Sequence, residues 1–388
     1  MASQVGLCLL LVLTTALFLR TLLWIQDQDP GFRAEGRVAF QVRLPSQDYP
    51  KEAQVDRFYR DLLARLRAIP GVAAADAGAV LPFSGSHSRT IVFKEGQTPE
   101  FTPDALEADM NIVTPGWFET LGTPLVEGRY PTEADTQSGG RRIWISRSLA
   151  RKLYPEGAIG HRMRTGAASE TTDGNTELEI TGVVADVHER NLELPAEDRF
   201  WVLESAFPTS ILAVVLKTDA PPQALRGSIQ AALKGLDPRL PLASVERLQT
   251  YVDRSLQGRR MVTLLLGGFT LLALLLAGVG IHGVVAYQVA QRSREIGIRM
   301  ALGAEARQVL GLILGQGLRL TAWGLAAGLV SSLALARLLA SQVYGIRPLD
   351  PVSIASALAV LGGSALLASL LPALRATRVD PAVALRAD

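Results

Sequence analysis

The chain has 388 residues, of which only 20% are charged, and its mean hydropathy is positive at +0.22. Soluble proteins of this size usually carry more charge, so the composition argues against a wholly soluble protein. The formal net charge of +2 gives no argument for nucleic-acid binding, and the single cysteine excludes an intrachain disulfide.

Four stretches are long and apolar enough to cross a bilayer, whose hydrocarbon core needs roughly 20 helical residues. They cover residues 5–25, 262–289, 320–336 and 353–371, and we expect Pro372 to end the last one. The first stretch is either a retained anchor or a cleaved signal peptide. We favour the anchor, because the stretch lacks a basic start and a small-residue cleavage site. The start "MASQVG" also suggests either the second half of a longer protein or a misassigned start.

Residues 26–258 have an ordinary soluble composition, in which strand-like and helix-like patterns alternate. The segment "RVAFQVRLP" alternates apolar and polar residues, as a half-buried strand does. A helix is predicted in residues 50–71, because the apolar side chains there recur on one face: Val55, Phe58, Tyr59, Leu62, Leu63 and Leu66.

Further strands are predicted at "VAAADAGAVLP", "LEITGVVADV" and "ILAVVLKT", and helices at "SRSLARKLYP" and "PPQALRGSIQAALKGLDP". The segments "EADTQSGGRR" and "TGAASETTDGNTE" are interpreted as polar, turn-rich loops. Strands with intervening amphipathic helices predict a mixed α+β domain.

Catalytic and metal-binding patterns are incomplete in this region. His188 and Glu189 begin the metalloprotease pattern H-E-x-x-H, but Leu192 occupies the second histidine position, which removes the metal site. The serines and histidine of "FSGSHS", residues 83–88, lack the strand–turn–helix context of a nucleophile. The pattern G-x-x-x-x-G-K-[ST] does not occur in these 388 residues. We therefore expect no enzyme activity, cofactor or metal in the chain itself, and ATPase activity only from a partner.

Basic residues predict the orientation in the membrane, since short cytoplasmic loops are rich in lysine and arginine. The loop between the second and third spans is the most basic one, with Arg292, Arg294, Arg299, Arg307 and Arg319. We therefore expect residues 293–304 and both termini in the cytoplasm. Residues 26–258 are expected on the other side, in the periplasm or extracytoplasmic space.

The segment "SREIGIRMALGA", residues 293–304, is short, basic and amphipathic. In a helix, Ile296 and Met300 share an apolar face, while Glu295 and Arg299 form an i,i+4 pair on a charged face. Such a helix suits docking into a groove of a soluble partner. It equally suits lying on anionic lipid headgroups, and amphipathicity alone does not separate these two hypotheses.

Two features stand out inside the predicted spans. Gly324 and Gly328 form a G-x-x-x-G pair, which lets two helices approach closely, although glycine is common in membrane helices generally. His282 has no acidic partner in any span, so we expect a neutral ring that hydrogen-bonds a neighbouring helix rather than a proton relay.

The segment "SREIGIRMALGA" resembles the coupling-loop signature of the FtsX-like/MacB-like permease family of bacterial ABC transporters. The stretches "NIVTPGWFETLGTPLVEGRYPTEAD", "YPEGAIGHRMR" and "EITGVVADVHERNL" resemble that family's periplasmic core domain, and "LPALRATRVDPAVALRAD" resembles its usual ending. The chain is most similar to the second half of long permeases that contain two such halves. It departs from the family at His282, where an aromatic residue is more usual.

The resemblance implies a multi-pass α-helical membrane protein with four transmembrane helices and a large α+β extracytoplasmic domain between helices 1 and 2. The expected domains are a transmembrane anchor at 1–25, a MacB-like periplasmic core domain at 26–258 and an FtsX-like permease domain at 259–388. The last would hold three transmembrane helices and a cytoplasmic coupling loop at 291–308. The implied location is the bacterial inner membrane.

By the same resemblance, the coupling loop would dock on a separate ABC ATPase subunit. The expected contact residues are Arg294, Glu295, Ile296, Gly297, Arg299, Met300 and Gly303. The chain would form a homo- or heterodimer with another permease half, in contact with membrane lipids and without nucleic acid. ATP-driven closure would move the long second span and the periplasmic domain, for export or extraction of a periplasmic substrate. The alternative is a regulatory or scaffold protein whose periplasmic domain controls a cell-envelope partner.

Overall fold

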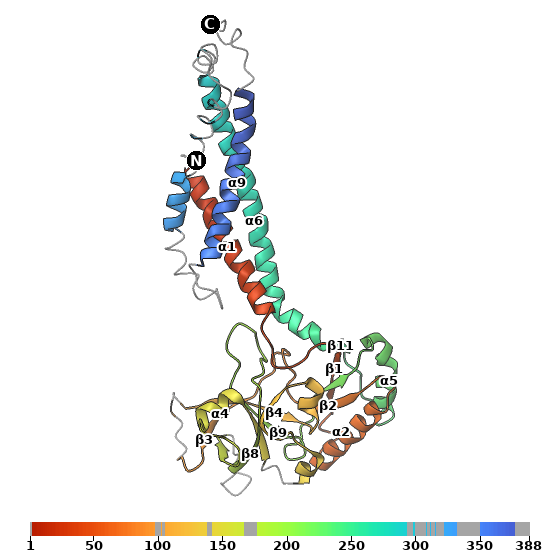
Figure 1. Cartoon of the computed structure of the whole chain (residues 1–388). Helices are drawn as coiled ribbons and strands as arrows, with labels where there is room; N and C mark the ends of the chain where they lie inside the picture. The colour runs from red at the N-terminus through yellow and green to blue at the C-terminus, as the bar shows by residue number, and fades with distance from the viewer. Residues whose placement is uncertain are drawn as a thin grey trace. The chain divides into compact units, whose positions relative to one another are not determined.

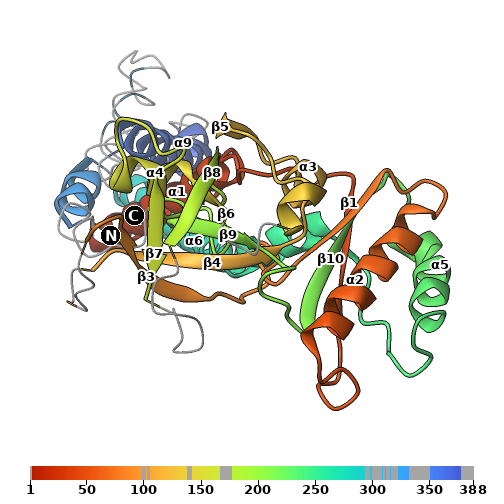
Figure 2. The same cartoon turned by 90° about the horizontal axis from the view of Figure 1, so that it is seen from below.

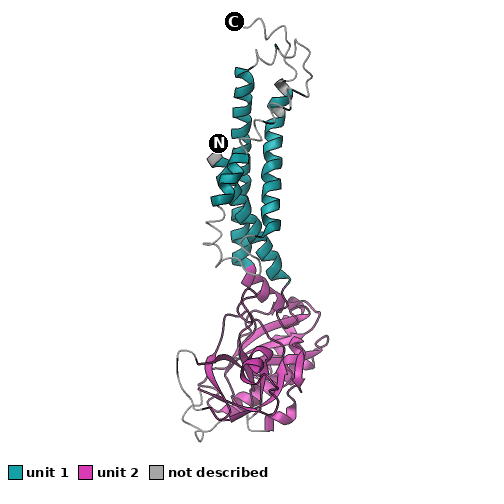
Figure 3. Ribbon diagram, turned by 60° about the vertical axis from the view of Figure 1, so that its left-hand side comes forward, with its two compact units in different colours: residues 1–27, 257–388 teal, residues 28–256 magenta. Residues whose placement is uncertain are grey.

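The computed structural model describes residues 2–97, 102, 105–137, 142–166, 177–292, 298, 308, 311, 315, 322–331 and 350–376. The chain divides into two compact units, shown in Figure 3. Residues 1–27 and 257–388 form the helical unit, and residues 28–256 form the sheet unit.

Part of the sheet in the sheet unit closes into a ring of strands (Figure 2). Around the ring, each strand pairs with the next and the last pairs with the first: β3 (Arg89–Lys94), β4 (Glu107–Val113), β9 (Arg199–Leu203), β6 (Arg142–Ser146), β8 (Glu177–Val184) and β7 (Arg162–Thr165). The β4–β9 and β6–β8 pairs are parallel and the other ring pairs are antiparallel. β5 (Leu125–Gly128) adds to β8. Inward apolar side chains of the ring and of α4 (Arg147–Leu153) form one core.

A second layer extends from this ring through a β2–β4 contact at Gly78 and Val113. It contains the antiparallel strands β2 (Ala74–Gly78), β10 (Ile211–Lys217), β1 (Arg37–Arg43) and β11 (Glu246–Arg247). α2 (Glu52–Arg67) and α5 (Pro222–Lys234) cover this layer and share its core (Figures 1 and 2). The sheet unit therefore has two hydrophobic cores joined by strand pairing.

Most sequence predictions for the sheet unit are confirmed. All six residues predicted on one face of residues 50–71 are buried in α2. The predicted strands correspond to β1, β2, β8 and β10, and the predicted helices to α4 and α5. β1 departs from simple alternation, because its first four residues are all buried where the strand lies between β10 and β11.

The loop prediction for residues 133–142 is wrong at both ends of the segment, and residues 138–141 lie outside the described part of the chain. Glu133–Gln137 is a short 3₁₀ helix, η1, and Arg142 begins β6. Inside η1, the Asp135 carboxylate is buried and forms ion pairs with Arg129 at 2.6 Å and Arg142 at 2.5 Å. Hydrogen bonds from Arg129 lower the pKa of Asp135 well below its usual range. These two arginines flank η1 and neutralise its buried aspartate, while the other residues of η1 are exposed or half-buried. In the second predicted loop, residues 167–176 lie outside the described part of the chain.

Within the described residues, three helices of the chain are long and apolar enough to cross a membrane: α1 (Ala2–Gln26), α6 (Leu248–Gln291) and α9 (Pro351–Ala376). α6 begins well before the predicted start at residue 262, and its first residues, 248–256, group with the sheet unit. A shorter apolar helix, Ala322–Ser331, lies inside the predicted third span. The remaining residues of that span are not described.

The prediction that Pro372 ends the last span is wrong, because α9 continues through this proline to Ala376. Proline lacks the N–H that would bond the carbonyl oxygen four residues earlier, and its ring crowds that carbonyl. Membrane helices tolerate this loss where neighbouring groups satisfy the freed carbonyl. The neighbouring group here is a side chain of α6, described below.

Candidate functional site

The residues predicted to contact an ATPase all lie outside the described part of the chain: Arg294, Glu295, Ile296, Gly297, Arg299, Met300 and Gly303. Ile298, within the same segment, is described; it is helical and exposed. The contact set therefore stays a prediction, and the described site consists of the helices that lead into this segment.

α6 is the element that leads into the predicted coupling segment. It has 44 residues without a break, which at 1.5 Å per residue is about 66 Å, roughly twice the thickness of a bilayer's hydrocarbon core. One of its faces is apolar and exposed, including Leu264, Leu272 and Val279. Such a face fits lipid or another hydrophobic helix.

α1 packs against α6 in the antiparallel sense. Near the middle of α1, the hydroxyl groups of Thr15 and Thr270 lie 2.7 Å apart, and Thr270 Oγ1 donates to the Leu11 carbonyl. Near the start of α1, a Cβ added at Gly280 would lie 3.1 Å from Oε1 of Gln4. Later residues of α6 therefore meet earlier residues of α1.

α1 also runs antiparallel to α9. Val5 shares a buried apolar cluster with Ala365 and Ala373, near the end of α9. Near the other end of α1, Arg20 forms an ion pair with Asp350, and the same carboxylate accepts a hydrogen bond from the Ser353 amide at 2.7 Å. Asp350 thus caps the N-terminus of α9 while it binds α1. The start of α1 and the end of α9 consequently lie at the same end of the helical unit.

The helix Ala322–Ser331 lies beside α1 (Figure 1), and two of its glycines contact α1. A Cβ added at Gly328 would lie 2.8 Å from the Cα of Gly6 and 2.9 Å from the Gly6 oxygen. A Cβ added at Gly6 would in turn lie 3.4 Å from the Gly324 oxygen. The two backbones are in direct contact, as the G-x-x-x-G spacing allows.

His282 is half-buried on α6 and faces α9. Its Nδ1 lies 3.3 Å from the carbonyl oxygen of Ala368. A carbonyl oxygen only accepts, so Nδ1 must carry the proton in this bond. The prediction that this histidine hydrogen-bonds a neighbouring helix is confirmed.

In the sheet unit, the stretch "NIVTPGWF" joins the two cores. The side chain of Asn111 bonds both the amide and the carbonyl of Val80, at 2.9 and 2.8 Å. Thr114 donates to the buried Asp76 carboxylate and accepts from the Ala77 amide. A Cβ at Gly116 would lie 2.6 Å from Asp76 Oδ2, so a larger residue there would displace the buried, hydrogen-bonded carboxylate. These residues have an architectural role in the sheet unit.

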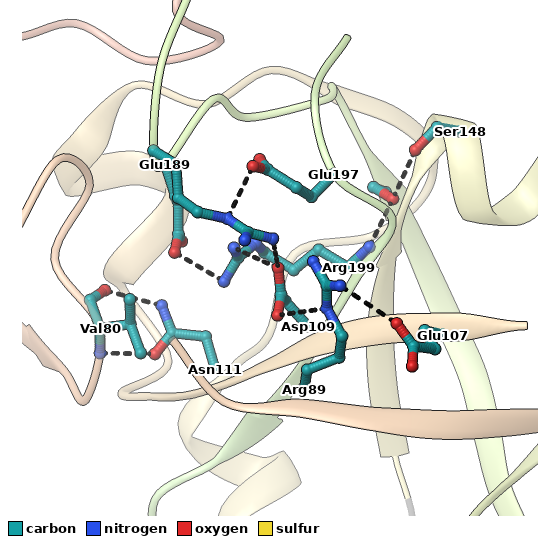
Figure 4. Close-up of polar contacts among 11 residues, drawn as sticks. Val80, Arg89, Glu107, Asp109, Asn111, Ser148, Glu189, Glu197 and Arg199 are labelled. Carbon is teal, nitrogen blue, oxygen red and sulfur yellow. Dashed lines mark hydrogen bonds and ion pairs between the residues drawn. The ribbon is translucent and has the colours of Figure 1, made fainter. Parts of the chain in front are cut away.

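Next to this stretch, β4 and β9 hold a buried cluster of charged side chains (Figure 4). The Arg199 side chain is almost fully buried and pairs with Glu189 at 2.7 Å and Asp109 at 3.7 Å. Asp109 also receives Arg190 at 3.2 Å and Arg89 at 3.6 Å. Burial raises the pKa of Glu189, and the nearby Arg199 opposes that rise. Each buried charge has an oppositely charged neighbour, as the low-dielectric interior requires.

The glutamate of the incomplete metalloprotease pattern, Glu189, belongs to this cluster of charged side chains. Glu189 pairs with an arginine, and His188 Nδ1 lies 3.1 Å from the Asn191 oxygen. The described residues contain no group of histidine, cysteine and acidic side chains able to hold a metal ion. In the segment "FSGSHS", Ser84 Oγ accepts from the Ser86 amide, and no described hydrogen bond joins either hydroxyl to His87. The sequence did not indicate the cluster, because its members come from distant segments.

A small cavity of about 60 Å³ lies between α2, η1 and the end of β9. Glu204 lines this cavity and is 6% exposed, and its Oε1 has no hydrogen-bond partner among the described residues. Asp56 and Arg60 of α2 also line it and pair with one another. The cavity has room for about two water molecules, so it suits hydration of these groups rather than a drug-sized ligand.

Two family models match the chain. The MacB-like periplasmic core domain matches residues 24–232, more than half of the chain, and the FtsX-like permease C-terminal matches residues 267–381. The first match covers most of the sheet unit, and the second covers the described helices from the middle of α6 onward.

The relatives include "Pyoverdine export ATP-binding/permease protein PvdT" of Pseudomonas syringae pv. tomato, 29% identical over 279 residues, which span 68% of this chain and 40% of that protein. "Macrolide export ATP-binding/permease protein MacB" of Wolinella succinogenes is 25% identical over 310 residues, which span 76% and 46%. The chain thus matches less than half the length of these relatives.

Among solved structures, the periplasmic region of MacB from Actinobacillus actinomycetemcomitans has a TM-score of 0.39 at 13% identity and covers 60% of this chain and 98% of that one. The extracellular domain of the ABC-type transporter YknZ has a TM-score of 0.35 at 15% identity, with 53% and 100% covered.

Proposed function

The chain belongs to the FtsX-like/MacB-like permease family, the membrane component of ABC transporters, and on this premise we propose that it couples ATP hydrolysis by a separate ATPase subunit to movement of a periplasmic domain. Membership implies a multi-pass inner-membrane protein with a periplasmic domain. In this proposal the sheet unit is that domain, four helices span the membrane, and residues 291–308 form the cytoplasmic coupling loop.

The observation that supports coupling is the continuity of α6. The helix includes residues of the sheet unit, 248–256, and continues through the helical unit to Gln291, where the proposed coupling loop begins. A hydrogen-bonded helix changes length little under load, because every residue is fixed to the fourth residue before it. A displacement at its last turn would therefore be carried along the helix. In this proposal the substrate does not have to cross a pore.

The energy source in this proposal lies outside the 388 residues, because the sequence contains no phosphate-binding loop. Both relatives described above are named as ATP-binding/permease proteins for export. By analogy we propose that this chain serves export or extraction of a periplasmic substrate. We further propose that it acts with another permease half, since the exposed apolar face of α6 could pack against a second set of membrane helices.

The coupling proposal is tested at Arg299. Substitution Arg299→Glu should abolish ATP-dependent export by the complex, because it reverses the charge of the face proposed to contact the ATPase. Insertion in the membrane should be unchanged. The measurement is export activity in cells together with the amount of chain in the membrane fraction, when the chain is co-expressed with each candidate ATPase. A cysteine at Ile296 should crosslink to the productive ATPase in the same cells.

The matched control is Arg292→Glu, which changes the charge of the same loop by the same amount but lies just after α6. It should retain most of the export activity. Equal loss in both variants would mean that the loop acts only through its total charge, as a topology signal. Failure of Ile296→Cys to crosslink with any candidate ATPase would favour the headgroup-bound helix.

A further inference from the structure

Pro372 leaves a backbone carbonyl of α9 without its usual partner. In an α-helix the N–H of each residue bonds the carbonyl four residues earlier, and for position 372 that carbonyl belongs to Ala368. Proline has no N–H, yet α9 continues to Ala376. In a membrane an unsatisfied carbonyl cannot turn to water, so it needs a donor from elsewhere in the protein.

Nearby hydroxyl groups do not supply that donor. The Ser369 hydroxyl bonds the Ala365 carbonyl at 2.8 Å, and the Ser364 hydroxyl bonds the Leu361 carbonyl at 2.9 Å. His282 of α6 does reach it, with Nδ1 at 3.3 Å from the Ala368 oxygen. One ring thus meets the one carbonyl that the proline has freed.

The surrounding residues of α6 hold the ring in place. Gly278 is one turn before His282, so both lie on the same face of the helix. A Cβ added at Gly278 would lie 3.9 Å from the Cβ of Ala368, an ordinary contact distance. Ile281 and Val285 of α6 pack with Ala365 and partly buried Ala368 in one apolar cluster. α6 and α9 therefore meet closely at the level of this bond.

We propose that His282 is a positioning residue that replaces the hydrogen bond removed by Pro372 and so fixes α6 against α9 in one register. A slide or rotation of α6 would leave the Ala368 carbonyl without a hydrogen-bond donor. The hydrogen bond from His282 therefore resists relative movement of these two helices. This inference concerns the packing of the chain itself and does not need an ATPase or a substrate. It can therefore fail or succeed independently of the proposed transport function.

The test is a double-mutant cycle on the full chain in membranes, with a disulfide as reporter. The reporter chain carries Cys8→Ala, Gly278→Cys and Ala368→Cys, since the added Cβ atoms fall within the range of about 3.5–4.5 Å typical of disulfides. His282→Phe keeps a ring but removes the donor, and should slow disulfide formation about three- to ten-fold. His282→Gln keeps an N–H donor and should restore a rate within about two-fold of the parent.

The decisive comparison is made in the Pro372→Ala background. There the residue at 372 supplies its own N–H to Ala368, so His282→Phe should no longer slow the reaction. Ser369→Ala, which removes a hydroxyl engaged elsewhere, is the matched control and should leave the rate unchanged in both backgrounds.

The proposal is overturned if His282→Phe has the same effect with and without Pro372, because the ring would then act by packing alone. It is also overturned if His282→Phe has no effect in the native background. The thermal unfolding midpoint of the same variants without the reporter cysteines, measured in detergent, provides a second readout. The midpoint should fall for His282→Phe only when Pro372 is present, and any other pattern contradicts the proposal.

Discussion

Glu204 is a buried carboxyl group whose titration should make the stability of the sheet unit depend on pH. It follows β9 and lines the small cavity together with Asp56 and Arg60 of α2. Burial raises its pKa to about 7 from an ordinary value of 4.5; Asp56 adds to this rise and Arg60 opposes it. Because the folded state holds the proton more tightly than the unfolded state, deprotonation disfavours folding. The stabilising effect is complete below about pH 4.5 and is lost as the pH rises through 7.

We expect Glu204→Gln to be more stable than the native chain at pH 8, by on the order of 3 kcal/mol, and to differ little from it at pH 5. Glutamine keeps the shape of the protonated acid but does not titrate. The measurement is urea unfolding of the full chain in detergent, followed by fluorescence of the buried tryptophans of the sheet unit. Glu177→Gln is the control, because Glu177 is more exposed and pairs with the exposed Arg162. A change in stability of equal size at both pH values for Glu204→Gln would contradict the raised pKa of Glu204 in the folded state.

No local pattern in the sequence marks Glu204, Asp109 or Asp135 as buried. Asp109 is stabilised by partners from other segments, Glu204 lines a cavity that only the fold creates, and Asp135 is paired with the nearby Arg129 and Arg142. His282 is the opposite case. A lone histidine in an apolar span has to find a donor or acceptor on another helix, so its interaction was predictable, although its partner carbonyl was not.

At the scale of elements, α2 shows what periodicity predicts and the ring of strands shows what it does not. The apolar face of α2 follows from a spacing of three and four residues, which is local information. The parallel β4–β9 and β6–β8 pairs join segments far apart in the chain, and single-sequence patterns carry no signal for such pairing. The prediction that Pro372 ends a helix is wrong for a related reason. The rule that proline ends a helix assumes that no side chain from another helix can satisfy the freed carbonyl.

The contact between α1 and the helix Ala322–Ser331 should be sensitive to added volume. We expect Gly328→Val to destabilise the helical unit by about 1–3 kcal/mol, because its Cβ would overlap backbone atoms of Gly6 that cannot rotate away. The measurement is the thermal unfolding midpoint of the full chain in detergent. Gly283→Val is the matched control. It introduces the same side chain into a membrane helix at a position with no neighbour within 4 Å. Equal shifts in the two variants would show that the effect comes from helix propensity rather than from the contact.

At the scale of the whole chain, the antiparallel packing of α1 limits the possible topologies. Val5 and Ala373 meet in one cluster while Arg20 pairs with Asp350, so the start of α1 and the end of α9 lie at the same end of the helical unit. In sequence, the sheet unit, residues 28–256, lies between the two parts of the helical unit, residues 1–27 and 257–388. This packing supports an even number of spans. It is independent of the distribution of arginines among the loops, which predicts the same side of the membrane for both termini.

Which of these two ends faces the cytoplasm can be measured with single cysteines in a Cys8→Ala chain. A cysteine at Gly140, in the sheet unit, should react with a membrane-impermeant maleimide in spheroplasts, whereas a cysteine at Gly303 should react only after the membrane is permeabilised. The reason is that arginine-rich short loops stay on the cytoplasmic side, and the segment around Gly303 lies in the most basic loop of the chain. A cysteine replacing the exposed Gly71, also in the sheet unit, is the control for access and should behave like Gly140→Cys. If Gly303→Cys reacted with the maleimide in intact spheroplasts and Gly140→Cys did not, the coupling segment would lie outside the cytoplasm. No cytoplasmic ATPase could then contact it, and the docking proposal would be wrong.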